Sequence, residues 1–189
     1  MAVDPTIDLR RRFTVEEYEL MGRTGILGED DRTELLDGEI VSMSPIGPRH
    51  AGTVDVLNRR FVLAVGERAI VRVQNPVRLL PASEPQPDLV LARPRHDFYI
   101  GSHPTAEDTY LAVEVADSSL ATDRAIKLPI YARQAIPEVW IVDLAARRVH
   151  VHTDPVDGVY GTVRTLGPGD VLVPTALADV RIAVDDILL

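Results

Sequence analysis

The chain has 189 residues, of which 46% are hydrophobic and 26% are charged, so it has enough apolar side chains for a sizeable buried core. Its 20 basic and 29 acidic residues give a net charge of −9, which excludes unspecific coating of a polyanion through long-range attraction. The absence of cysteine excludes disulfides, thiolate zinc sites and a cysteine nucleophile. The sequence contains no apolar run long enough to predict a membrane span and no recognisable signal peptide, so we expect a cytoplasmic protein.

Two helices and a hairpin are predicted in the first third of the chain. Thr14 and Glu17 have the spacing of a capping box and predict a short helix that begins there. An Asp-Gly pair between apolar residues predicts a hairpin over residues 35–41. Apolar residues recur at helical spacing from His50 to about Gly66, which predicts an amphipathic helix over that range.

Extended segments are predicted next, separated by turn residues. Residues 70–73 and 77–79 have the composition of strands, and a short strand is predicted at 88–91. Residues 93–108 form a polar loop whose length indicates flexibility or function. A strongly apolar strand is predicted at 110–116.

The C-terminal part is predicted to begin with a helix and to continue as antiparallel strands. Residues 120–135 are expected to be helical, with Pro129 as an internal defect that kinks or restarts the helix. Further strands are predicted at 138–143, 148–152, 159–165 and 171–173. Because no linker or repeat interrupts the pattern, we expect a single α/β domain over residues 1–189.

Two carboxylates occupy strand positions where a charge is costly. Glu114 lies inside an apolar run and shares its strand face with Ala112 and Ala116, which are small enough to leave room for an ion and a substrate. Asp88 begins another predicted strand. Two carboxylates from neighbouring strands form the hard-oxygen site that Mg²⁺ or Mn²⁺ prefers.

Lys127 is the only lysine among the 20 basic residues, and it lies on the predicted helix directly after the Glu114 strand. A lysine beside two carboxylates can orient or deprotonate a water, or hold a phosphate as a point charge, and arginine has too high a pKa and too large a head for that role. Two simpler interpretations stay open. Lys127 could be a solvated helix residue, and Glu114 could be a strand-end acid capped by Arg124.

Several catalytic motifs are absent, among them a glycine-rich phosphate loop, a G-x-S-x-G elbow and an H-E-x-x-H helix. His150 and His152 share one face of a predicted strand and could hold a metal, although a solvated edge strand explains them more simply. His96 and His103 lie in the polar loop with no partner nearby in the sequence.

The order of Pro87-Asp88, then Glu114 inside an apolar strand, then Lys127 resembles the PD-(D/E)XK nuclease superfamily. More closely, the chain is similar to the mostly bacterial Uma-two family of restriction-endonuclease-like proteins. The similarity covers about residues 13 to 150. The matching segments are 34–45, His50, 83–90, 112–118, 123–127, 131–132 and 136–143.

The resemblance implies an α/β fold with a restriction-endonuclease-like mixed β-sheet flanked by helices and additional antiparallel C-terminal strands. It implies that Asp88 and Glu114 bind a divalent metal and that Glu34 points into the same site. It also implies that Lys127 replaces the usual lysine, which in the superfamily lies two residues after the acid, where this chain has Ala116.

Two further positions match the family. His50 is an accessory site residue in this interpretation, and Tyr131 is structural. The leading hypothesis is then a metal-dependent endonuclease that uses Mg²⁺ or Mn²⁺ to hydrolyse phosphodiester bonds in DNA. In it, Asp88 and Glu114 hold the ion, Lys127 positions a water, and Glu34 orients the site or supports a second ion.

Binding of DNA by an acidic protein would need a local basic groove. Candidates are the arginines at and after the first long helix and those after the Asp88 strand, although a solvated surface explains them equally well. These residues are Arg59, Arg60, Arg68, Arg72, Arg93 and Arg95.

Two rival hypotheses remain. One is a catalytically idle nuclease-fold protein that acts as a binding or interaction module. The other is a structural dimer whose acids form internal salt bridges with Arg124 or Arg133. We expect a homodimer for the nuclease as well, because one active site cuts one strand. The choice between DNA and RNA, the sequence cut and the pathway stay open at this point.

Overall fold

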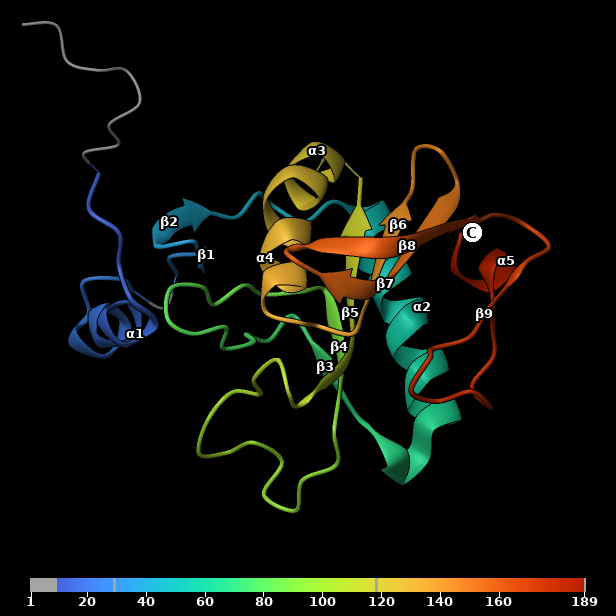
Figure 1. The fold of residues 1–189 in the computed structure, drawn as a ribbon, viewed down its shortest axis with the longest axis horizontal. Helices are drawn as coiled ribbons and strands as arrows, with labels where there is room; N and C mark the ends of the chain where they lie inside the picture. The colour runs from blue at the N-terminus through green and yellow to red at the C-terminus, as the bar shows by residue number, and fades with distance from the viewer. Residues whose placement is uncertain (1–9, 29, 118, 189) are drawn as a thin grey trace, which may run out of the picture.

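The computed structural model describes residues 10–28, 30–117 and 119–188 (Figure 1). Its central element is a six-stranded mixed sheet in the order β3-β4-β5-β6-β7-β8, in which β5 and β6 are parallel and the other neighbours are antiparallel. The strands are β3 (Ile70–Val73), β4 (Leu89–Ala92), β5 (Thr109–Ala116), β6 (Glu138–Asp143), β7 (Arg148–Val156) and β8 (Val159–Leu166). The predicted mixed sheet is confirmed.

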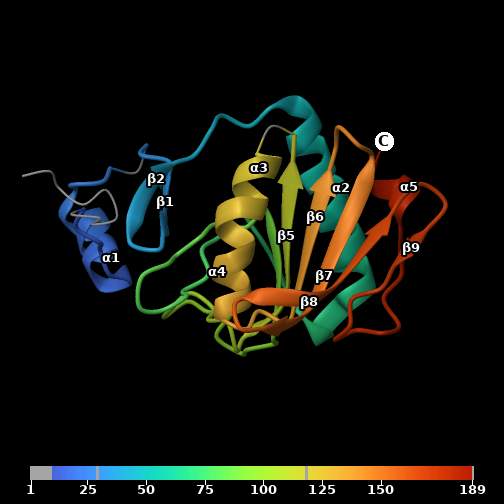
Figure 2. The ribbon, with the colours of Figure 1, turned by 45° about the horizontal axis from the view of Figure 1, so that its top comes forward.

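Helices cover both faces of the sheet (Figure 2). One face carries α2 (Pro48–Val65) and the short helix α5 (Val184–Ile187), whose apolar side chains join one buried cluster with the inward residues of the central strands. The opposite face carries α4 (Leu128–Arg133), where Ile130 packs with Ala112 in a second cluster. Successive side chains of a strand point to opposite sides of the sheet. Because helices cover both sides, β5 and β6 are buried on both faces.

The connection from β5 to the parallel strand β6 is helical, as parallel pairs require. It consists of α3 (Leu120–Thr122), the π-helical segment η2 (Asp123–Lys127) and α4. The sequence predicted a kink or restart of the helix at Pro129. The structure shows there a change from the π-helical segment η2 to the α-helix α4, directly before the proline. The Leu128 N–H bonds to the Asp123 carbonyl, five residues back, and this wider turn accommodates the proline that follows.

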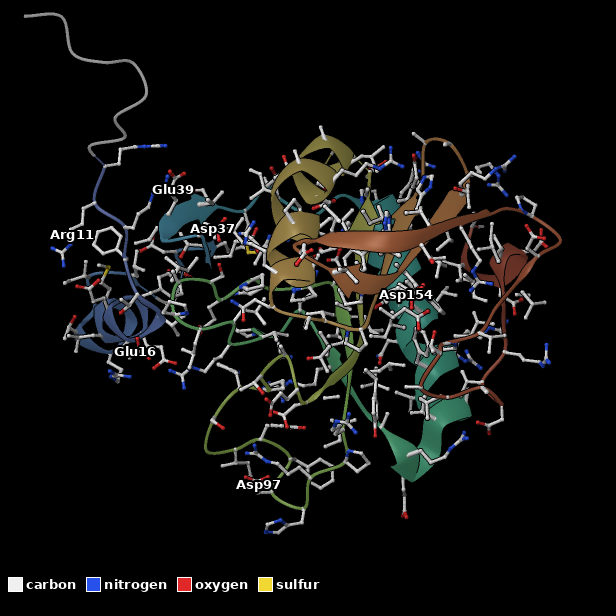
Figure 3. The ribbon with its side chains drawn as sticks, viewed as in Figure 1. Arg11, Glu16, Asp37, Glu39, Asp97 and Asp154 are labelled. Carbon is white, nitrogen blue, oxygen red and sulfur yellow. The ribbon has the colours of Figure 1, made fainter. Side chains whose placement is uncertain are left out.

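An N-terminal unit lies beside the sheet and contains α1 (Val15–Thr24) and the hairpin of β1 (Thr33–Leu36) and β2 (Glu39–Ser42). Both hydrogen bonds of the predicted capping box at the start of α1 are present. Asp37 and Gly38 form the hairpin turn with φ of 47° and 80°, as the Asp-Gly pair predicts. Figure 3 labels Asp37 and Glu39 on this hairpin.

Two expectations from the sequence are wrong. Residues 77–79 do not form a strand and make only isolated bridges, because Pro76 and Pro81 flank them and lack the N–H groups that a ladder needs. The strand with His150 and His152 is not an edge strand, since β7 pairs with β6 on one side and β8 on the other.

The remaining elements are short. They are η1 (Gly66–Arg68), β9 (Val171–Leu172) and β10 (Ile182–Ala183), the last two forming a separate antiparallel pair. The polar loop predicted at 93–108 connects β4 to β5, and Asp97 in Figure 3 marks its position. Within the described part of the chain, no helix combines the length and apolar character needed to cross a bilayer.

Candidate active site

Asp88 and Glu114 meet on adjacent strands. The antiparallel register pairs Leu89 with Val113, and continuing it by one residue sets Asp88 opposite Glu114. The Val115 N–H donates to Asp88 Oδ2 at 2.8 Å, and His50 Nε2 lies 3.0 Å from the same oxygen. This hydrogen bond raises the pKa of His50. The Asp88 carboxylate is therefore held both by the backbone of β5 and by a side chain from the first turn of α2.

Glu114 is only 3% exposed and has a partner at each oxygen. The Tyr131 hydroxyl donates to Oε1 at 2.5 Å, and Lys127 Nζ donates to Oε2 at 3.3 Å. Burial raises the pKa of Glu114 well above its usual range, although the charge of Lys127 opposes the shift. Arg124 is not the cap of this acid, so that simpler interpretation of Glu114 is wrong.

Lys127 lies at the end of η2 with 7% of its surface exposed, so it is not a solvated helix residue. Its Nζ is 3.1 Å from Glu34 Oε2 and bridges that carboxylate to Glu114. Burial alone would lower the pKa of Lys127, but the surrounding carboxylates outweigh it and raise the pKa above its usual range. The Lys127 side chain is therefore protonated at neutral pH.

Glu34 comes from the hairpin, far from Glu114 in the sequence. Its Oε2 also accepts the backbone N–H of Gln86 at 3.2 Å, and the neighbouring residue Leu35 bridges to Glu84. The segment that leads into Asp88 thus holds the hairpin against the sheet. The structure brings all four predicted carboxylate and lysine positions and His50 into one cluster.

The sequence interpretation missed three contributions. Asp123 is buried and accepts a hydrogen bond from the Ser119 hydroxyl at 2.6 Å, and burial raises its pKa. Gln74 Nε2 donates to Asp88 Oδ1 at 3.4 Å. Tyr131, interpreted as structural, binds Glu114 directly. The signal was present, because Asp123, Lys127 and Tyr131 recur every four residues on one helix and so share a face.

The small residues beside Glu114 do not leave the open space that we expected. Ala112 and Ala116 are buried against α4, where Ile130 and Tyr131 fill that side of the strand. Asp88 and His50 are the more exposed members of the cluster, with 13% and 16% of their side chains exposed.

The charge of the cluster fits a divalent cation. Lys127 Nζ contacts Glu34 and Glu114, and Asp123 also raises its pKa, while Asp88 lies opposite Glu114, so the cluster holds more carboxylates than cations. Among the residues that the structure describes, no three His, Asp or Glu side chains already converge as a ligand set. Asp88 and Glu114 offer hard carboxylate oxygens on adjacent strands, and Mg²⁺ is an ion that takes one or two such carboxylates and completes its shell with water and phosphate.

The arginines considered for a groove are dispersed. Arg60 and Arg68 form ion pairs with C-terminal aspartates on the α2 side, which is the sheet face opposite the cluster. Arg72 and Arg95 lie over the Tyr99 ring, at 5.7 and 4.1 Å from its centre. They do not form one groove beside the acids.

The salt bridges proposed for a structural dimer are also different from those observed. Arg133 pairs with Asp37 on the hairpin turn. Glu114 is paired with Lys127, which that hypothesis did not include.

A mixed sheet with two opposed carboxylates and a neighbouring lysine defines a protein of the restriction-endonuclease-like class. A family model, Uma2, described as "Putative restriction endonuclease", matches residues 15–185. The chain belongs to this family, and the resemblance inferred from the sequence is confirmed. No curated protein has a sequence that matches the chain.

A solved structure supports the fold. A protein from Anabaena variabilis ATCC 29413, described as "a putative nuclease belonging to DUF820", superposes with a TM-score of 0.69 and 13% sequence identity. The alignment covers 93% of this chain and 97% of the other. At this identity the likeness concerns the fold.

Proposed function

We propose that this protein is a metal-dependent endonuclease that hydrolyses phosphodiester bonds in DNA. The observation that carries the proposal is the Lys127 ammonium held between Glu34 and Glu114, with Asp88 opposite Glu114 on the next strand. An internal ion pair would need one carboxylate, whereas Lys127 contacts two, and Asp88 lies opposite one of them.

Asp88 and Glu114 would hold Mg²⁺ or Mn²⁺, because their oxygens are hard donors on adjacent strands. When bound, the ion supplies positive charge that polarises the scissile phosphate and acidifies water. Val115 and Tyr131 hold the two carboxylates in fixed orientations through their hydrogen bonds. His50 is a positioning residue for Asp88.

Lys127 acts as a hydrogen-bond donor in this mechanism. Because its pKa is raised, its Nζ orients the attacking water or a phosphate oxygen and does not remove a proton. Glu34 keeps the ammonium close to Glu114. Hydrolysis adds the water oxygen to phosphorus and leaves a proton on the departing sugar oxygen, so a covalent enzyme intermediate is not needed.

The test is nicking of supercoiled plasmid with Mn²⁺ and then Mg²⁺. Asp88→Asn keeps the size of the side chain and removes its charge, and we expect about a 100-fold loss of activity or more, since metal assistance contributes several kcal/mol. Asp55→Asn, an exposed position on α2, is the matched control and should retain wild-type activity. Equal nicking by wild type and Asp88→Asn would contradict the assignment.

A second candidate is a catalytically idle nuclease fold that serves as a binding or interaction module. It is favoured by one observation, that both oxygens of Glu114 already have protein partners. The absence of nicking together with the absence of a saturable Mn²⁺ site in calorimetry would support it. Our proposal further includes a single domain, a cytoplasmic location and a homodimer, in which two sites would cut both strands of a duplex.

A further inference from the structure

A nuclease also needs an exposed cation for the substrate phosphates that flank the one being cut. Lys127 cannot serve, because it is buried and bound to two carboxylates. Arg124, three residues earlier on η2, is exposed. Within the described residues its guanidinium has neither a hydrogen bond nor an ion pair.

The surface beneath Arg124 belongs to the same sheet face as Glu114. The register runs from Glu114 on β5 to Ile141 on β6, His150 on β7 and Thr165 on β8. The helix that continues from η2 contacts β7 and β8. His150 and Thr165 are linked by a contact of 3.0 Å between Nδ1 and Oγ1, which gives this floor a fixed polar structure.

Two histidines of that floor interact with the charge of Arg124. Burial lowers the pKa of His150, and Arg124 lowers it further. Burial, followed by His150 and Arg124, lowers the pKa of His152 to about 4. The nearest acid on these strands, Asp143, has Oδ2 at 3.9 Å from His150 Nε2 and uses Oδ1 to accept the Ala146 N–H. The charge of Arg124 is thus left for a ligand.

Arg124 and Lys127 belong to the same short segment, η2, with the guanidinium exposed and the ammonium buried in the cluster. A polyanionic strand that reaches the cluster therefore meets an exposed cation on the same element.

We propose that Arg124 binds a backbone phosphate of the nucleic-acid substrate next to the scissile one, above the His150 and Thr165 floor. The inference rests on the proposed function and adds a substrate-binding residue to it. An arginine suits this role because its planar fork forms paired hydrogen bonds with phosphate oxygens.

The test is fluorescence anisotropy of a labelled DNA duplex in EDTA, measured over a series of salt concentrations. Arg124→Gln should raise Kd about 3- to 10-fold and make the slope of log K against log salt shallower by about 0.9, as expected for the loss of one phosphate contact. Arg59→Gln is the matched control. Arg59 is also exposed, helical and unpaired among the described residues, but it lies on α2, on the other sheet face.

Equal affinities of wild type and Arg124→Gln, equal losses in the two variants, or no binding by the wild type would overturn the inference. So would Arg124-dependent binding to poly-glutamate without binding to the duplex, which would indicate an acidic protein partner. Arg124-dependent binding without any plasmid nicking would overturn only the proposed hydrolysis. Nicking with binding that does not depend on Arg124 would overturn only this inference.

Discussion

Lys127 is a buried cation whose charge is needed by two carboxylates from distant parts of the chain. Glu34 comes from the hairpin and Glu114 from the centre of the sheet, and both contact the same ammonium. Removing one member of such a group costs more than the pair is worth, because an uncompensated charge stays buried. The loss of stability on removing Lys127 therefore measures how strongly the three side chains depend on one another, and it is not the net contribution of the group.

Lys127→Met should lower the free energy of unfolding by about 3 to 5 kcal/mol at neutral pH, since it leaves the two glutamates without a cation. The double variant Lys127→Met/Glu114→Gln should regain a large part of this loss, because it removes one of the stranded charges. Urea denaturation measures both. Additive losses in the double variant would contradict the assigned coupling.

At the scale of elements, much of the fold could be predicted from the sequence. The capping box of α1, the Asp-Gly turn and the apolar periodicity of α2 are local signals, and each element formed where its signal lies. The segment at 77–79 makes only isolated bridges because Pro76 and Pro81 flank it, a signal that its strand-like composition outweighed in the prediction. The π turn of η2 depends on how the helix packs over β5, which no local pattern encodes.

For the candidate site, the sequence predicted the residues but not their contacts. Glu114 stood out as a charge inside an apolar strand, Asp88 as an acid at the start of a strand, and Lys127 as the only lysine. His50 and Glu34 entered through the family resemblance. Whether a charged residue is buried beside another requires the fold, so the contacts of Lys127 with Glu34 and of Tyr131 with Glu114 came only from the structure.

The β1–β2 turn has little room for a side chain at Gly38. A Cβ there would lie 2.7 Å from the Cβ of Arg12, and the φ of 80° disfavours any residue with a Cβ. We expect Gly38→Ala to destabilise the protein by about 1 to 3 kcal/mol and to weaken activity, because the hairpin carries Glu34. Gly22→Ala, in α1 with open space around it, should instead be neutral or stabilising by up to about 1 kcal/mol. Thermal unfolding of the two variants checks the opposite signs.

At the scale of the whole molecule, several buried acids hold protons more tightly when the protein is folded. Burial raises the pKa of Glu84 from 4.5 to about 7, helped by nearby Glu19, and the pKa of Asp123 and Glu114 is raised as well. Above the unfolded pKa, the native state therefore binds more protons than the unfolded state, and stability falls as the pH rises towards the folded pKa.

The Glu84 contribution can be isolated with Glu84→Gln. From pH 4.5 to 7, wild type should lose about 1 to 3 kcal/mol more stability than this variant. Urea midpoints across that range provide the measurement, and parallel pH curves for the two proteins would contradict the raised pKa of Glu84.

The parallel pairing of β5 with β6 also has a consequence for the order of folding. Hairpins such as β6–β7 and β7–β8 join segments close in the chain, whereas β5 and β6 can pair only after the intervening crossover has docked. That crossover carries Asp123, Lys127 and Tyr131, so the docking that lets β5 and β6 pair also assembles the cluster around Lys127. A chain in which β5 and β6 have not yet paired consequently lacks the assembled cluster at Lys127.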